Sequence, residues 1–519
     1  MSNSVLKRTR QILASIFFLI LVLSFLDFRQ VIPDSWFSLI LFLQFTPSVL
    51  NFMQSPTVLA GGFIIVLALT VFTGRTYCSV ICPLGTYQDL VNRLGGKIKR
   101  RNRRFAYGRA HNILRYSILA FTLILMLAGS VFLISLLDPY SVFGRFVSYF
   151  FKPVLVTANN LVAWIGAKFD YYGIFKVAYT KIPPVSYILP LVFFALVGIM
   201  AFGNGRLYCN TVCPVGTLLG IISKVSLLRI SIDSENCTHC GRCSVNCKAS
   251  CIDFINEEID VSRCVSCFNC IDACQDNAML YSYSNPARKS PADEVNSKRR
   301  RFIGSGLSLM IAALGTARAQ KVPVPKKEST VREDKKYPVC PYGAISLEHF
   351  NSYCTACSLC VSACPEHVIV PSVIEYGLAG IMQPRMDYHK SFCNFDCIRC
   401  TEVCPTGALL PLSVEAKKLT QIGKVNFIKE NCIVETEGTD CGACSEHCPT
   451  KAVTMVPYRD KLVIPEVNNE ICVGCGACEF ACPTKPYKAI FVDGNPVHLD
   501  AKKPEEKKVE AGELEDFPF

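Results

Sequence analysis

The stretch CTHCGRCSVNC, residues 237–247, places four cysteines at intervals of two, two and three residues, and CVSCFNCIDAC, residues 264–274, repeats these intervals. Three thiolates on a tight loop can wrap one cubane iron–sulfur cluster, and in this spacing the fourth cysteine of each run binds the other cluster. The spacing therefore predicts one [4Fe–4S] cluster held by Cys237, Cys240, Cys243 and Cys274, and a second held by Cys264, Cys267, Cys270 and Cys247. Zinc is the alternative for clustered cysteines, and two consecutive runs of this kind argue against it.

Runs of the bacterial ferredoxin kind return four times near the C-terminus, and the first and fourth of them have the same spacing. The runs are Cys354, Cys357, Cys360 and Cys364; Cys393, Cys397, Cys400 and Cys404; Cys432, Cys441, Cys444 and Cys448; and Cys472, Cys475, Cys478 and Cys482. A proline follows each run, and the third run carries an insert of eight residues after its first cysteine. These runs predict four further [4Fe–4S] clusters, which makes six for the chain.

Two cysteines lie outside every run and every repeated motif. Cys251 stands where ferredoxins usually carry a small buried alanine, so we interpret it as an inert buried thiol that packs as a small hydrophobe. Cys340, in the stretch CPYGA, resembles the end of a ferredoxin run that has no beginning. We favour a structural role for Cys340 over a ligand role.

The first part of the chain has the composition of a membrane protein. Half of the 519 residues are hydrophobic and the mean hydropathy is +0.30. Four segments are apolar and long enough to approach the roughly 20 residues of a spanning helix, namely 11–27, 57–73, 113–137 and 185–203. Two further stretches, 36–52 and 142–167, are ambiguous, and we interpret the first as an interfacial or re-entrant piece.

Basic residues predict the orientation of these spans. Lys7, Arg8 and Arg10 precede the first segment, and a second group of lysines and arginines fills residues 97–109. The positive-inside rule places both groups in the cytoplasm. The net charge of +12 is therefore explained largely by loops next to the membrane, and we expect no nucleic-acid partner.

A repeated motif follows the second and the fourth apolar segments. GRTYCSVICPLGT, residues 74–86, comes back as GRLYCNTVCPVGT, residues 205–217. Glycine commonly ends a helix and proline suits the first turn of the next one. The four cysteines, Cys78, Cys82, Cys209 and Cys213, are candidates for a further metal or iron–sulfur centre. Redox-active thiols and a purely structural role are the two alternatives.

A third feature lies in the middle of the chain. Arg299 and Arg300 precede a short apolar run and resemble a twin-arginine export signal, and a basic patch before a surface helix is the alternative.

The predicted domains are a four-span membrane domain (1–227), a cytoplasmic two-cluster ferredoxin domain (228–284), a linker with the twin-arginine-like motif (285–301), a signal or anchor span (302–319), a second linker (320–337), a periplasmic four-cluster ferredoxin domain (338–499) and a disordered tail (500–519).

Together these features predict a fold class and a set of cofactors. We expect a multi-pass, α-helical membrane protein of the bacterial inner membrane, with four spans plus an internal signal-anchor span and two α+β ferredoxin-like iron–sulfur domains. No Cys-x-x-Cys-His motif occurs, which argues against c-type haem. Only His111 lies near an apolar segment, so no histidine pair can hold a b-type haem, and no haem is expected. The absence of nucleotide-binding and hydrolytic motifs indicates electron transfer rather than bond chemistry.

The chain resembles two subunits of one system. Residues 1–284 are similar to the NapH-type membrane subunit that feeds electrons to periplasmic nitrate reductase, and residues 298–499 are similar to its NapG-type four-cluster partner. This resemblance implies a quinol dehydrogenase subunit that takes electrons from the quinone pool and delivers them to a periplasmic reductase or cytochrome. It also implies that the outer two runs of the C-terminal domain pair, so that Cys482 completes the set of Cys354, Cys357 and Cys360. Related membrane proteins imply two alternatives, an accessory factor for metal-centre assembly or metal reduction and a redox-sensing regulator.

Overall fold

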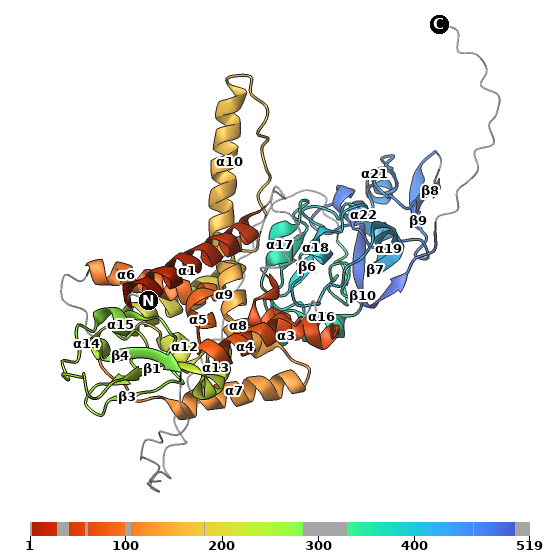
Figure 1. Cartoon of the computed structure of the whole chain (residues 1–519). Coiled ribbons are helices and arrows are strands. Elements are labelled where there is room, and N and C mark those ends of the chain that lie inside the picture. The colour runs from red at the N-terminus through yellow and green to blue at the C-terminus, as the bar shows by residue number, and fades with distance from the viewer. Residues whose placement is uncertain are drawn as a thin grey trace.

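A computed structural model describes residues 3–27, 41–57, 61–98, 105–180, 182–283, 330–459 and 461–503. Figure 1 shows a central group of helices with a small α+β domain at one end and a larger α+β domain at the other. The predicted twin-arginine motif and the signal or anchor span of 302–319 lie outside the described residues, as does most of the predicted tail.

Four apolar helices overlap the predicted spans. They are α1 (Asn3–Leu26), α4 (Gly62–Thr73), α7 (Asn112–Leu127) and α11 (Val185–Asn204). Within the part of the chain that the structure describes, only Val5–Leu26 and Val185–Asn204 are long and apolar enough to cross a membrane. Helices α4 and α7 have 12 and 16 residues, or about 18 and 24 Å of length against a hydrocarbon core of about 30 Å.

The prediction of four spans is therefore not supported, and the reason is local. The third predicted span breaks after α7 at Gly129, whose φ is +79°, and resumes as α8 (Phe132–Leu137). A left-handed residue cannot continue an α-helix. The second predicted span begins late, at Gly62 of α4.

Shorter helices fill the space around these four. They are α3 (Phe45–Gln54), α5 (Tyr77–Val80), α6 (Pro83–Ile98), α9 (Pro139–Phe146), the π-helix η2 (Val147–Phe151), α10 (Lys152–Ala167), α12 (Leu207–Thr211), α13 (Pro214–Ile222) and the 3₁₀-helix η3 (Ser223–Val225). The two stretches that the sequence left ambiguous thus contain α3 and the run from α9 to α10. Pro47 is accepted in α3 because it lies in the first turn, where its missing N–H has no partner to lose.

The small domain closes where its sequence predicts. Strand β1 (Leu228–Ile232) pairs antiparallel with β4 (Met279–Tyr283), with Leu228 opposite Tyr283. Between them lie β2 (Ile252–Asp253), β3 (Glu258–Ile259), α14 (Arg242–Val245) and α15 (Asn269–Ala273). Each short helix contains the third cysteine of one run, Cys243 in α14 and Cys270 in α15, so the domain consists of two similar halves.

The large domain is built from three two-stranded antiparallel sheets. Strands β5 (Ile369–Pro371) and β6 (Pro384–Met386) pair, as do β8 (Val453–Pro457) with β9 (Val463–Val467), and β7 (Thr420–Phe427) with β10 (Ile490–Asp500). The helices are α16 (Leu347–Tyr353), α17 (Leu359–Ala363), the 3₁₀-helix η4 (Leu378–Gly380), α18 (Arg399–Glu402), α19 (Val414–Leu419), the 3₁₀-helix η5 (Lys429–Asn431), α20 (Ile433–Thr436), α21 (Ala443–Glu446) and α22 (Ala477–Ala481). Strand β10 closes the domain by returning to β7.

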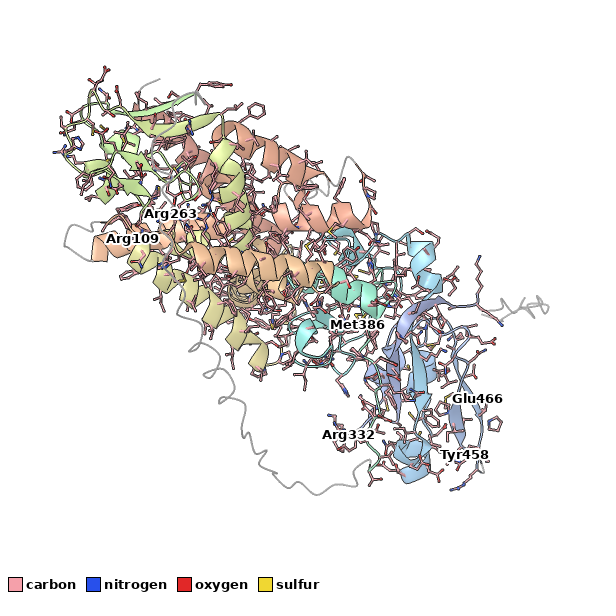
Figure 2. The ribbon with its side chains drawn as sticks, turned by 90° about the horizontal axis from the view of Figure 1, so that it is seen from below. Arg109, Arg263, Arg332, Met386, Tyr458 and Glu466 are labelled. Carbon is pink, nitrogen blue, oxygen red and sulfur yellow. The ribbon has the colours of Figure 1, made fainter. Side chains whose placement is uncertain are left out.

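Helix α1 contacts both α+β domains, one near each of its ends. Lys7 forms an ion pair with Asp272 of α15 at 2.6 Å, and the backbone carbonyl of Phe25 accepts a hydrogen bond of 2.8 Å from Ser362 of α17. At 1.5 Å of rise per residue these two contacts are about 27 Å apart along α1. Figure 2 shows the small and the large α+β domain on opposite sides of the helices, with Arg109 and Arg263 at one end of the molecule and Tyr458 at the other.

Candidate iron–sulfur and thiol centres

The first ferredoxin domain gathers its eight cysteines into the two sets that the spacing predicts. Cys237, Cys240, Cys243 and Cys274 line one cavity. Cys247 lies close enough to Cys264 and Cys270 for their charges to interact. The fourth cysteine of each run therefore faces the other run, across the two similar halves of the domain.

Backbone conformation explains how these loops curl around a site. In each of the four runs with strict intervals of two, the second and fourth residues after the first cysteine have positive φ. The residues are His239 and Gly241, Ser266 and Phe268, Ala356 and Ser358, and Gly474 and Gly476. Left-handed residues turn the chain back on itself, so that successive N–H groups face inward. The N–H of Gly474, for example, lies 3.4 Å from Cys472 Sγ.

The large domain groups its cysteines by neighbouring runs. Cys404 lies close enough to Cys354, Cys357 and Cys360 for their charges to interact. In the same way, Cys364 lies close to Cys393, Cys397 and Cys400. In the second half, Cys482 lines a cavity with Cys432, Cys441 and Cys444, and Cys448 lies with Cys472, Cys475 and Cys478.

This grouping corrects the pairing implied by the resemblance. Cys482 does not complete the set of Cys354, because that place is taken by Cys404. The physical reason is that two consecutive runs fold as one local two-cluster unit, in which each fourth cysteine reaches the adjacent run. The large domain therefore carries two such units in series and not an outer pair around an inner pair.

The donors around these sets suit iron–sulfur clusters. Cluster sulfurs and cysteine thiolates are stabilised by hydrogen bonds from nearby N–H groups. Leu409 N lies 3.4 Å from Cys404 Sγ, and the Lys417 ammonium lies 3.4 Å from Cys393 Sγ. All-thiolate sets with such donors fit [4Fe–4S] clusters, which supply sites that take up and release single electrons.

The repeated motif forms a seventh meeting point of cysteines. Gly74 and Gly205 end α4 and α11 with φ of +75° and +65°, and a Cβ at Gly205 would lie 2.5 Å from the Lys248 carbonyl oxygen. After each glycine the chain turns back toward the other helices and forms a short helix, α5 in the first copy and α12 in the second. Cys78, Cys82, Cys209 and Cys213 are between 3% and 4% exposed. Their charges interact with one another, so the duplication brings four buried thiols together.

Two buried arginines hold the two copies of the motif against each other. Arg75 Nη2 donates to the Cys209 carbonyl oxygen at 3.1 Å, and Arg206 Nη1 donates to the Cys78 carbonyl oxygen at 2.8 Å. Arg75 also donates to Ser262 O of the first ferredoxin domain at 2.8 Å. Gln88 Nε2 lies 3.1 Å from Cys209 Sγ. These donors surround the thiols with positive and polar groups.

The charge around the four thiols is strongly positive. Asp89 of α6 accepts ion pairs from Arg10, Arg206 and Lys248 at 3.1, 3.0 and 3.2 Å. Burial alone would raise the pKa of Asp89, but these three cations hold it below its ordinary value. Arg75, with no exposed surface, donates to backbone and amide oxygens, and its Nη2 lies 3.9 Å from Cys78 Sγ. A buried cation without a compensating anion is costly, so the excess suits an anionic centre made by thiolates.

The four thiols lie between the two ferredoxin domains. On one side, the positive charge of Arg75 interacts with both Cys78, one of the four thiols, and Cys264 of the first ferredoxin domain. On the other side, Tyr208 donates to Leu137 O at 2.7 Å, and the adjoining helix α9 packs so closely on the large domain that a Cβ at Gly144 would lie 2.7 Å from Cys357 O. The order along the molecule is thus the Cys264 set, the four thiols and the Cys354 set.

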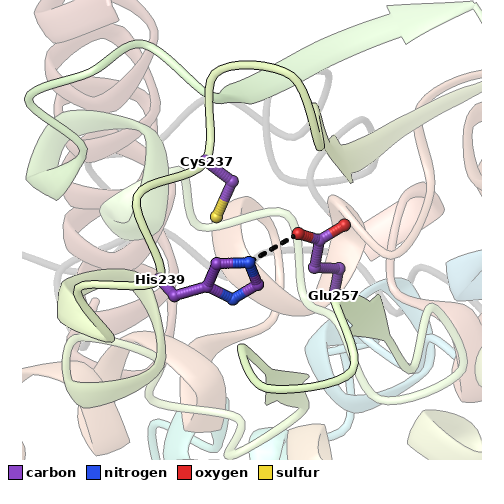
Figure 3. A group of neighbouring side chains, drawn as sticks. All are labelled: Cys237, His239 and Glu257. Carbon is purple, nitrogen blue, oxygen red and sulfur yellow. Dashed lines mark ion pairs between the residues drawn. The ribbon is translucent and has the colours of Figure 1, made fainter.

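The two isolated cysteines differ in their surroundings. Cys251 Sγ lies 3.5 Å from Cys247 Sγ, so it packs against a ligand set, whereas Cys340 Sγ lies 3.3 Å from the Tyr376 hydroxyl. A third feature, absent from the sequence reasoning, is an ion pair of 3.1 Å between His239 and Glu257. It stands beside Cys237 (Figure 3).

Sequence reasoning also missed Arg75, Arg206, Asp89 and Gln88. The two arginines could have been noticed because both copies of the motif contain them. Asp89 and Gln88 had no such signal, since each lies on α6 outside the repeat and acquires its role only through contacts with distant segments.

Comparison with known families supports the iron–sulfur assignment. Residues 55–102 and 185–232, which contain the two copies of the motif, match a family described as a 4Fe-4S binding domain. Residues 353–409 and 439–485 match families described as 4Fe-4S dicluster domains. Each dicluster match covers most of two neighbouring runs, in agreement with the grouping of Cys404 and Cys482 in the structure.

The chain is similar to several ferredoxin-type proteins at low identity. It is 24% identical to the putative electron transport protein YccM of Escherichia coli over 53% of this chain and 71% of the relative. It is 29% identical to the methylamine utilization ferredoxin-type protein MauM of Methylobacillus flagellatus over 26% and 59%, and 25% identical to the ferredoxin-type protein NapF of Escherichia coli over 24% and 68%. No solved structure matches the chain. The chain is accordingly an iron–sulfur electron-transfer protein that contains ferredoxin-type 4Fe-4S domains.

Proposed function

We propose that this protein carries electrons across the bacterial inner membrane, from the quinol pool to a periplasmic reductase or cytochrome. The observation that carries the proposal is the order of the cysteine sets. Two sets lie at the start of α1, the four buried thiols lie among the helices, and four sets begin at the end of α1. A storage protein or a sensor has no need of such a series along one axis.

The proposed orientation places the first ferredoxin domain in the cytoplasm and the large domain in the periplasm. Lys7 and Arg10, which the positive-inside rule assigns to the cytoplasm, contact the first ferredoxin domain and α6 respectively. The large domain contacts the opposite end of α1. The export-like motif at Arg299 and Arg300, between the two domains in sequence, agrees with this arrangement.

Within this function the chain's own residues hold and insulate the centres. Arg75 and Arg206 offset the negative charge of the four-thiol centre, which we propose to be a seventh iron–sulfur or metal centre. The apolar core, which runs without a break from Phe25 and Phe143 to Phe350, keeps water away from the sets at the junction. The burial of Cys78, Cys82, Cys209 and Cys213 disfavours the alternative of an accessory metal reductase, because such a protein must meet its metal at an accessible thiol.

The test is a spectroscopic titration of the purified full chain. Iron and acid-labile sulfide should correspond to at least six cubane clusters, and the reduced protein should show several coupled EPR signals. A water-soluble hydroquinone analogue should reduce part of the clusters, and dithionite should reduce more. Zinc in place of iron, or only two clusters, would contradict the proposal, as would a C-terminal reporter that is active only in the cytoplasm.

A further inference from the structure

A cavity of about 410 Å³ lies where the helices meet the large domain. One wall is apolar and comes from α3 and the end of α7, with Leu50, Met53, Met126 and Leu127. The other wall is polar and comes from α16 and its N-cap, with His349 and Tyr353. We call this space the α16 cavity.

The apolar wall of the cavity is exposed, as expected if the cavity opens toward the membrane of the proposed function. Leu127 is 88% exposed and Met53 is 52% exposed. Leucine and methionine at such exposure are unfavourable in water, and they are normal on a surface that faces lipid. A ligand that enters from this side would be amphipathic, with an apolar body and a polar ring edge.

The polar wall adjoins a cysteine set. Tyr353 immediately precedes Cys354, and His349 Nε2 lies 3.0 Å from the carbonyl oxygen of Gly407, three residues after Cys404. Both Cys354 and Cys404 belong to the same set. A ligand in the α16 cavity would therefore lie next to the first electron centre of the large domain.

We propose that the α16 cavity binds the ring of a membrane hydroquinone, an inference that rests on the proposed function and locates its electron-donor site. A carbonyl oxygen can only accept a hydrogen bond, so His349 Nε2 carries the hydrogen and Nδ1 is left as an acceptor. His349 Nδ1 accepts the hydrogen bond of one ring hydroxyl. Ligand sites usually measure about 300 to 1,000 Å³, and 410 Å³ accommodates one substituted ring with the start of its tail.

The electron and proton balance of the step is simple. Oxidation of a hydroquinone to the quinone breaks two O–H bonds and releases two electrons and two protons. A cluster held by the Cys354 set would be the oxidant, and it would pass the first electron to the adjacent cysteine set before it accepts the second. His349 Nδ1 receives the first proton, and the second passes to water on the polar side, where Glu348 lines the cavity and is exposed.

Two other cavities in the described part of the chain fit this ligand less well. One, of about 130 Å³ between η2, α10 and α17, is too small for a substituted ring. The other, of about 1,010 Å³, is lined by the segment just before the large domain and by the large domain itself, and charged side chains such as Arg332, Lys336 and Asp387 dominate it. Of the three, only the α16 cavity is large enough for a substituted ring and is also lined by apolar residues of the helices.

The test uses the full chain in detergent and the fluorescent hydroquinone analogue heptyl-hydroxyquinoline N-oxide, whose quenching reports binding without turnover. Met53→Trp should fill the cavity, and His349→Ala should remove the acceptor; each should weaken binding by about tenfold or more. The matched controls are Leu161→Trp, an equally exposed position on α10, and His367→Ala, whose hydrogen bond to Thr180 lies at the smaller cavity. Both controls should bind as the unchanged chain does.

The possible outcomes separate this inference from the proposed function. If the unchanged chain binds the analogue and neither Met53→Trp nor His349→Ala weakens binding, the location is wrong while quinol oxidation stands. Weaker binding in His367→Ala alone would move the site to the smaller cavity. If the unchanged chain binds no analogue, both the site and the quinol-oxidising function are overturned. Iron content, which should stay constant in all four variants, shows that each is folded.

Discussion

Arg75 and Arg206 occupy equivalent positions in the two copies of the repeated motif, and each donates a hydrogen bond to the carbonyl oxygen of the first cysteine in the other copy. The distances are 3.1 Å to Cys209 O and 2.8 Å to Cys78 O. This exchange fastens the ends of α4 and α11 to each other and places two guanidinium groups beside four thiols. It accounts for the arginine in both copies, which the cysteines alone do not explain.

Replacement of Cys78, Cys82, Cys209 and Cys213 by serine should show what these thiols hold. If they bind a cubane cluster, iron and sulfide should each fall by about four per chain, while the ferredoxin signals persist. A metal centre without sulfide should lower the metal content alone. Unchanged metal and unchanged spectra would leave redox thiols or a structural role.

Arg75→Met should impair the same centre, because it removes a buried positive charge near the thiols. We expect loss of that centre's signal with the six ferredoxin clusters retained. Arg109→Met is the matched control, since Arg109 lies in an exposed loop, and it should leave the metal content unchanged. Equal spectra for Arg75→Met and the unchanged chain would show that the charge of Arg75 is not needed.

The pairing of Cys404 with Cys354 can be tested by combining substitutions. Cys354→Ser and Cys404→Ser each remove a ligand of the same set, so the double variant should lose no more iron than either single one, about four atoms. Cys354→Ser with Cys482→Ser should lose about eight, because two sets are affected. The opposite pattern would restore the pairing of the outer runs.

Asp89→Asn should destabilise the helical part of the protein. The carboxylate compensates Arg10, Arg206 and Lys248 in the interior, and its loss leaves three buried cations without an anion, at a cost of about 3 to 5 kcal/mol of unfolding free energy. Asp272→Asn breaks only the half-exposed pair with Lys7 and should cost about 1 kcal/mol or less. Denaturant unfolding in detergent, followed by circular dichroism, measures both, and equal stabilities would contradict the role of Asp89.

The large domain should lose stability at mildly acid pH through His498. Burial lowers the pKa of His498 to about 4, against about 6.5 in an unfolded chain. The unfolded state therefore binds a proton first as the pH falls, so stability decreases from about pH 6.5 down to about pH 4 and changes little above that range. The shift corresponds to about 1 to 3 kcal/mol.

The comparison for this effect is His498→Gln against His447→Gln. His447 is exposed, so its substitution should leave the pH dependence of unfolding as it is. His498→Gln should give a flatter profile between pH 4 and pH 6.5. A profile as steep as that of the unchanged chain would assign the acid sensitivity to other groups.

Local sequence patterns predict some features of this chain correctly and others not. The sets of the first ferredoxin domain follow from spacing, because a loop of a few residues can wrap a cluster in only a few ways. The turns at Gly74 and Gly205 follow from residue type, since glycine accepts the left-handed conformation found there. The four spans were overestimated, because hydropathy does not register the break at Gly129 that ends α7.

The sequence by itself determined which cysteines act in groups of three and that one motif is duplicated, since both are set by intervals of a few residues along the chain. Only the tertiary structure decided that Cys404 completes the set of Cys354 and that Asp89 collects cations from three segments. These relationships join residues far apart in sequence, and packing rather than spacing brings them within reach.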